Sequence, residues 1–302
     1  DQGHKRILII CGEDRSKSIE HTIEAIQTAY AVRRNGAAVR RINVEIAPLT
    51  VEEFARLKEA KIGTYICFQE TYDPELYSKY HLSGPKADYL NRLHVMDRAM
   101  QGGIEDVGIG ALFGLAEYRP EVLALLSHAA HLEKEYGVGF HTISVPRIQK
   151  ADGADLSVAR YIPTDEDFLK LVAVLRLAVP YTGIIISTRE TLAMRKKLLQ
   201  IGISQISGGS RTSVGGYEKP EATDENSAQF DVNDRRTLDE VVNWLLELGH
   251  IPSFCTACYR EGRTGDRFMS LVKTGKIADC CQPNALMTLK EYLTDYASED
   301  TR

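Results

Sequence analysis

Four of the six cysteines lie in one short segment near the C-terminus, at a spacing that suits a metal site. Cys255 and Cys258 form a C-x-x-C pair, and Cys281 follows after 22 intervening residues, with Cys280 beside it. Thiolates from Cys255, Cys258 and Cys281 fit an iron–sulfur cube with one open iron, although such clusters more often have four cysteines. Adjacent side chains point in different directions and rarely ligate one metal together. The C-x2-C-x22-C spacing and the Gln-Pro-Asn-Ala sequence after Cys281 favour Cys281, so we expect Cys280 to be a bystander. A zinc site and inert thiols are the alternatives that the spacing leaves open.

A second set of polar residues follows short apolar runs along the first two thirds of the chain. Arginine presents a planar fork that suits a carboxylate, and glutamate suits an ammonium group, so the set indicates a receptor for amino-acid-like ligands. The plainer alternative is that Arg147 and Arg189 form ion pairs at the surface. The members of the set are Gly12, Glu13, Glu45, Gln69, Glu70, Tyr72, Arg147, Arg189 and Ser207.

The apolar runs read as strands that alternate with helices. The expected strands are 6–11, 39–46, 64–68, 106–110, 140–147, 183–187 and 203–207, and the expected helices include 18–35, a helix from Thr50, 88–101, 120–136, 165–178, a helix ending at Gln200, and 237–248. The run at 6–11 is continuous and apolar, as in a strand buried on both faces. Seven strand–helix units predict an α/β fold, a TIM-type (β/α)8 barrel that lacks its first strand and carries a C-terminal cysteine-bearing extension. We place the barrel, with its strands 2 to 8, at 1–216 and the extension at 217–302.

The barrel fold gives each polar residue a position. Sites in such barrels lie at the C-terminal ends of the strands, which is where the second polar set falls. His141 instead begins the strand that Arg147 ends, and six residues of strand separate the two by about 20 Å. His141 therefore faces the bottom of the barrel. A histidine at a strand start is more often a structural hydrogen-bonding residue than a metal ligand.

Composition excludes several classes of protein. The net charge is -5 and no basic arm is present, so we expect no binding to nucleic acid. No apolar run is long enough to cross a membrane, and the first residues do not resemble a signal peptide. Clustered cysteines without a secretory signal predict a location in the reducing cytoplasm.

Several motifs resemble the HydG family of [FeFe]-hydrogenase maturases, which are radical-SAM tyrosine lyases related to the thiazole-pathway enzyme ThiH. ThiH-like relatives lack the cysteine tail, so Cys255, Cys258 and Cys281 favour the HydG type. The motifs are Cys11-Gly-Glu-Asp14, Gln69-Glu-Thr-Tyr72, His141-Thr-Ile-Ser-Val-Pro-Arg147, Ser187-Thr-Arg-Glu190, Ile206-Ser-Gly-Gly-Ser-Arg-Thr212 and the C-x2-C-x22-C tail.

The resemblance implies a role for each candidate residue. Glu13 would hold the amino group of S-adenosyl-L-methionine and Arg147 its carboxylate, with Gly12 and Glu45 as further cofactor-binding residues. Arg189 would hold the carboxylate of the substrate tyrosine, in a pocket lined by Gln69, Glu70, Tyr72 and Ser207. The tail would carry an auxiliary [4Fe–4S] cluster with an additional iron, to which His141 and a bound amino acid are ligands.

The family's reaction cleaves the Cα–Cβ bond of tyrosine to p-cresol and dehydroglycine, and converts the latter to carbon monoxide and cyanide on iron. Its expected partners are other hydrogenase maturation proteins and an electron donor. One motif is absent: the C-x3-C-x2-C loop that binds the radical-generating [4Fe–4S] cluster. Cys11 and Cys67 are isolated and cannot replace it, so we expect that cluster and the first strand to lie before residue 1. The rival hypotheses are a ThiH-like lyase with a structural zinc tail and a non-catalytic iron–sulfur carrier.

Overall fold

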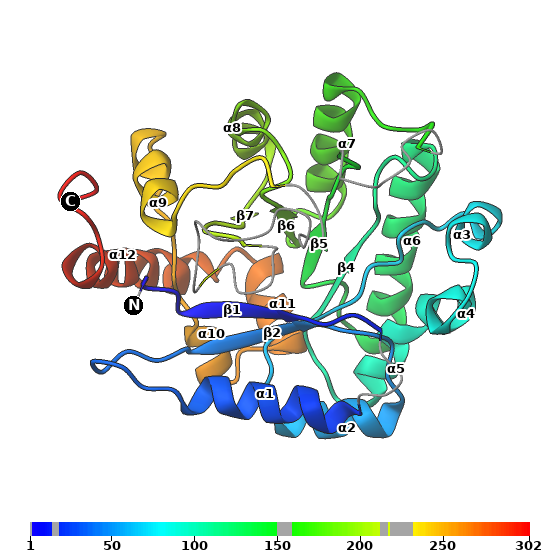
Figure 1. Cartoon of the computed structure of the whole chain (residues 1–302), viewed down its shortest axis with the longest axis horizontal. Coiled ribbons are helices and arrows are strands. Elements are labelled where there is room, and N and C mark those ends of the chain that lie inside the picture. Colours follow the sequence, from blue (N-terminus) through cyan, green and yellow to red (C-terminus); the bar gives the residue numbers. More distant parts are fainter. Residues whose placement is uncertain (1, 14–17, 150–158, 212–216, 218–231) are drawn as a thin grey trace.

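A parallel sheet of seven strands, in chain order, forms the centre of the computed structural model (Figure 1). The structure describes residues 2–13, 18–149, 159–211, 217 and 232–302. Each strand pairs with the next one along the chain, so the described sheet is an incomplete barrel of the predicted TIM type. The strands are β1 (Arg6–Ile10), β2 (Arg41–Glu45), β3 (Tyr65–Ile66), β4 (Val107–Gly110), β5 (Thr142–Ser144), β6 (Gly183–Ile186) and β7 (Gln205–Ile206).

Helices follow the strands and cover one face of the sheet (Figure 1). They are α1 (Ile19–Ala31), α2 (Val51–Glu59), α3 (Pro74–Tyr80), the short 3-10 helix η1 (Pro85–Ala87), α4 (Tyr89–Leu93), α5 (Val95–Gln101), α6 (Tyr118–Tyr136), α7 (Asp165–Ala178) and α8 (Leu192–Ile201). Beyond the sheet come α9 (Leu238–Glu247), α10 (Ala257–Arg260), α11 (Gly265–Lys273) and α12 (Ala278–Asp295). The capping box predicted from Thr50 and Glu53 is present at the start of α2.

Strand side chains alternate between a helix-facing side and an inner side. In β2, Ile42 and Val44 are fully buried in the core beneath the helices. Arg41, Asn43 and Glu45 therefore take the inner side. This alternation places polar residues along the inner side of β2.

The prediction that the first strand is buried on both faces is wrong. Ile7 and Ile9 pack against the core, but Leu8 and Ile10 are 42% and 48% exposed. These two residues are on the inner side of the strand at one end of the sheet, where no described strand closes the barrel.

Several helices differ from their predicted bounds. The first ends at Ala31, and Asn35 and Gly36 form a tight turn with positive φ instead of terminating the helix. The region expected as a polar loop after β3 contains α3 and η1, and the helix expected over 88–101 is divided at His94. The helices of the cysteine segment were not predicted.

The C-terminal helices form a second, small core that attaches to the start of the sheet. Leu289 and Tyr292 of α12 pack with Leu238 and Val242 of α9. Glu291 of α12 lies 3.0 Å from Lys5 and accepts hydrogen bonds from Arg40. The predicted domain boundary at 216/217 falls beside undescribed residues and stays a prediction. No helix in the described part of the chain is long and apolar enough to span a membrane.

Candidate functional site

Three charged residues predicted at strand ends influence one another electrostatically. Glu45 ends β2, in register with Ile10 of β1 and Ile66 of β3. Burial raises the pKa of Glu45 to about 7, with a further contribution from the charge of Glu70 and opposing ones from Arg189, Lys86 and Arg92. Burial lowers the pKa of Arg189, and Glu70 and Glu45 oppose that change. The charge set Glu45, Glu70 and Arg189 can therefore hold the two charges of an amino acid.

Glu70 is held in an unusual backbone conformation. Its φ is 67°, in the left-handed region that residues other than glycine seldom adopt. Its carbonyl oxygen accepts a hydrogen bond of 2.8 Å from the amide of Leu112, and its carboxylate lies 2.6 Å from Nζ of Lys86. Backbone strain of this kind is often found at functional sites. Lys86, which the sequence analysis did not single out, is thus a member of this site.

Arg92 of α4 contacts both Glu13 and the buried Cys67. Its Nη2 lies 2.6 Å from Oε1 of Glu13, and its Nη1 lies 2.9 Å from Sγ of Cys67. The second carboxylate oxygen of Glu13 is buried and has no hydrogen-bond partner in the described structure. A Cβ atom added to Gly12 would meet nothing within 4 Å, so the space beside that residue is open. An unpaired carboxylate oxygen is the type of acceptor that suits the ammonium group of S-adenosylmethionine.

Gln69 lies on the strand face opposite to Glu70. Tyr65 packs edge-on against Phe54 of α2, and alternation places Cys67 and Gln69 on that same helix-facing side. Gln69 is 1% exposed, and neither polar atom of its amide has a partner within the described structure.

Tyr72 and Ser207 are predicted pocket residues with few contacts to the charge set. The hydroxyl of Tyr72 shares a hydrogen bond of 2.9 Å with Nδ1 of His128 on α6, and its amide donates to the buried Glu121. Ser207 follows β7, and its carbonyl oxygen accepts a hydrogen bond from Arg195.

Arg147 is buried in an ion pair that the sequence did not reveal. Its Nε and Nη2 donate to the two carboxylate oxygens of Glu190, at 3.0 and 2.8 Å, and Glu190 is fully buried. Its Nη1 lies 2.8 Å from Asp165, whose side chain is 68% exposed. A ligand carboxylate can therefore replace Asp165 more readily than Glu190. Glu190 is the last residue of the motif Ser187-Thr-Arg-Glu190, but no role was predicted for it from the sequence.

His141 lies at the opposite end of the barrel, against the cysteine segment. Its ring centroid is 4.8 Å from that of Phe268 in α11, and its Nε2 is 3.5 Å from the hydroxyl oxygen of Tyr259, which follows Cys258. Burial lowers the pKa of His141, and its Nδ1 lies 3.6 Å from Asp106. The neutral imidazole favoured by burial is the form that binds metals.

The thiols of the tail share one neighbourhood. Cys258 is on α10, and Cys280 and Cys281 begin α12. Burial raises the pKa of Cys281, and the charges of Cys258, Cys255 and Cys280 raise it further, so all four thiols lie within electrostatic reach of one another. No group of three or more His, Cys, Asp or Glu side chains among the described residues is arranged to hold a metal ion. The donor set fits an iron–sulfur cluster chemically, and the choice of ligands stays a prediction.

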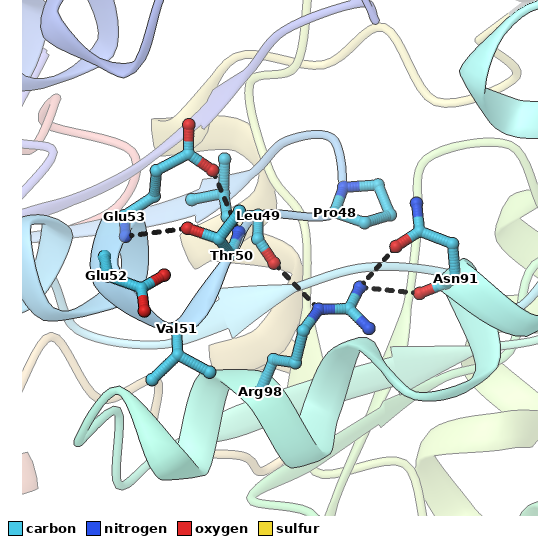
Figure 2. Close-up of a pocket in the computed structure, with 8 residues that line it drawn as sticks. All are labelled: Pro48, Leu49, Thr50, Val51, Glu52, Glu53, Asn91 and Arg98. Carbon is cyan, nitrogen blue, oxygen red and sulfur yellow. Dashed lines mark hydrogen bonds between the residues drawn. The ribbon is translucent and has the colours of Figure 1, made fainter.

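A separate groove lies at the start of α2 (Figure 2). Its polar groups are engaged with one another: Arg98 donates to the carbonyl oxygens of Leu49 and Asn91, and Glu53 belongs to the helix cap. None of the predicted site residues lines this groove.

Comparison with known proteins identifies relatives over almost the whole chain. Residues 144–251 match the Biotin and Thiamin Synthesis associated domain. A crystal structure of HydG, a maturase of the [FeFe]-hydrogenase, is 50% identical with a TM-score of 0.95, and covers 99% of this chain and 65% of its own. HydG from Carboxydothermus hydrogenoformans is 40% identical with a TM-score of 0.79, and covers 99% of this chain and 64% of its own.

Two curated enzymes and one further solved structure are similar at lower identity. The 2-iminoacetate synthases of Salmonella typhimurium and Escherichia coli are each 28% identical, over 257 and 259 residues, covering 83% of this chain and 64% of their own length. Methylornithine synthase, at 19% identity and a TM-score of 0.61, shares the fold. The chain thus spans slightly less than two thirds of the length of the HydG and 2-iminoacetate synthase proteins. In fold and sequence the chain is similar to HydG and, at lower identity, to 2-iminoacetate synthase.

Proposed function

We propose that the full-length protein is a cytoplasmic radical-SAM tyrosine lyase of the HydG type. It would cleave the Cα–Cβ bond of tyrosine to p-cresol and dehydroglycine, and convert dehydroglycine to carbon monoxide and cyanide for the [FeFe]-hydrogenase active site. The similarity to HydG over 99% of the chain, with 50% identity, is the observation that carries this proposal. Other maturation proteins and an electron donor are its expected partners.

The charge set supports the binding of an amino acid. Arg189 can donate two parallel hydrogen bonds to the carboxylate of tyrosine, because its guanidinium presents a planar fork. The charges of Glu70 and Glu45 act on Arg189, and their carboxylates suit the ammonium group of the same amino acid. Ser207 is the remaining candidate on this side, whereas Gln69 and Tyr72 would act from the helix-facing side.

The residues around Glu13 support the binding of the cofactor. The unpaired oxygen of Glu13 would accept a hydrogen bond from the ammonium group of S-adenosylmethionine, and Arg92 holds the other oxygen in place. Arg147 would bind the cofactor's carboxylate in place of Asp165. When bound with its iron–sulfur cluster, S-adenosylmethionine supplies the 5′-deoxyadenosyl radical that abstracts hydrogen from tyrosine.

The tail supports a second reaction at the other end of the barrel. Cys255, Cys258 and Cys281 would hold the auxiliary cluster, and His141, packed against the segment that carries two of these cysteines, would bind the additional iron.

Anaerobic reconstitution of the full-length protein with iron and sulfide tests the proposal. With tyrosine, S-adenosylmethionine and a reductant, we expect p-cresol together with carbon monoxide and cyanide. Formation of p-cresol and dehydroglycine alone would instead identify a 2-iminoacetate synthase, which the matches to those enzymes make the second candidate. Iron binding without tyrosine cleavage would identify a carrier.

A further inference from the structure

Tyr259 of the cysteine segment contacts both Arg41 and His141. These two residues lie at the N-terminal ends of their strands, an end of the sheet that we call the barrel floor. The guanidinium of Arg41 lies 3.4 Å from the centre of the Tyr259 ring, and it also contacts the Tyr259 hydroxyl. On the other side, that hydroxyl lies 3.5 Å from Nε2 of His141. Tyr259 thus contacts the first residue of β2 and the residue before β5, although 218 positions separate it from Arg41.

The contact with Tyr259 is a main stabilising contact of a buried charge. Arg41 is 4% exposed, forms no salt bridge with any described residue, and has an Nε atom without a hydrogen-bond partner. Its other described contact is with the hydroxyl of Thr64. A buried cation over an aromatic face is attracted by the ring's quadrupole, and more strongly when water is excluded. The buried charge of Arg41 is therefore stabilised by the Tyr259 ring, and the same contact fixes the cysteine segment to the barrel floor.

Contacts with the cysteine segment and with α11 also orient His141. Phe268 lies against one side of the imidazole and Asp106 lies 3.6 Å from Nδ1. The opposite ring nitrogen, Nε2, is left facing the residue that directly follows Cys258. Nδ1 has no hydrogen-bond partner in the described structure, so the described contacts that hold the ring are those with Phe268 and Tyr259.

We propose that Tyr259 is a positioning residue that fixes the C-x-x-C segment to the barrel floor, beside Nε2 of His141, before any metal binds. This inference rests on the proposed metal-binding role of the tail. The aromatic ring provides the attachment through Arg41, and the hydroxyl provides the contact with His141.

Hydrogen exchange of the metal-free, full-length protein tests the attachment. Tyr259→Ala and Arg41→Met should each raise the exchange rate of amides 257–265 about fivefold to thirtyfold, the range expected when a desolvated cation–π contact is lost. The double variant should exceed either single variant by little, because both changes remove the same contact. Tyr259→Phe keeps the ring and should retain the protection. Arg56→Met, which removes a surface pair with Glu20, is the matched control and should leave these amides unchanged.

Iron content provides a second measurement. After reconstitution with iron and sulfide, Tyr259→Ala should lose the tail's iron although all its cysteines remain, and Tyr259→Phe should keep it. Unchanged exchange in Arg41→Met, or full tail iron in Tyr259→Ala, would overturn the proposal. If Arg41→Met alters strand amides as well, Arg41→Lys, which keeps a cation over the ring, must restore protection for the proposal to stand. The exchange measurement needs no cluster or substrate, so its failure is distinguishable from failure of the proposed function.

Discussion

Replacing Glu45 with glutamine should stabilise the protein at alkaline pH and not at acid pH. Burial and the neighbouring Glu70 raise the pKa of Glu45 from 4.5 to about 7. The folded state therefore holds the proton more tightly than the unfolded state does. The resulting stabilisation is complete below pH 4.5 and is lost as the pH rises through about 7.

The size of the effect follows from the two pKa values. Each pH unit between them corresponds to 1.36 kcal/mol, so the ionised carboxylate destabilises the folded state by up to about 3 kcal/mol at pH 8. Glutamine has nearly the same shape and does not titrate. The difference in unfolding free energy between Glu45→Gln and the wild type should therefore grow by up to about 3 kcal/mol from pH 5 to pH 8.

Urea unfolding at several pH values measures this difference. Glu59→Gln, at an exposed position of α2, is the control and should change stability by less than about 0.5 kcal/mol at every pH. In a Glu70→Gln background the step should shrink, because one cause of the raised pKa is gone. Parallel pH dependence of the wild type and Glu45→Gln between pH 5 and 8 would refute the reasoning.

Four further predictions concern the site and the tail. Serine at Cys281 should remove iron from the tail and serine at Cys280 should not, as measured by iron analysis; the reverse result would exchange their roles. Arg189→Lys keeps the charge but loses the fork, so calorimetry should show weaker binding of tyrosine and unchanged binding of S-adenosylmethionine. Gln69→Leu removes a buried amide without partners and should raise the unfolding free energy by about 1 to 3 kcal/mol unless a bound ligand uses that amide. His141→Ala should still release p-cresol but no carbon monoxide or cyanide, whereas a merely structural histidine would reduce all three products together with the melting temperature.

The sequence predicted the sheet because each strand carries a local signal. Apolar runs bounded by polar or glycine-containing turns marked all seven strands, and Thr50 with Glu53 marked a helix start to the residue. Helix bounds were less certain where a turn such as Asn35-Gly36 resembles a helix end.

Most contacts within the candidate site depend on tertiary structure. Glu45 and Arg189 were predicted from strand ends, because parallel strands place their C-terminal ends at one edge. Lys86 and Arg92 come from helices within a region predicted as a polar loop and a single helix, and no local pattern connects either with Glu70 or Glu13. Likewise, nothing in the sequence pairs Arg41 with a ring 218 positions away.

The two end strands of the sheet affect how this chain behaves at high concentration. The outer edges of β1 and β7 are paired with no described strand. In β1 the sequence Arg-Ile-Leu-Ile-Ile also exposes Leu8 and Ile10. Short β-branched segments of this kind promote strand addition and aggregation. Overproduction of these 302 residues alone should therefore give material that self-associates through its edges, and a charged residue at Leu8 or Ile10 should improve its solubility.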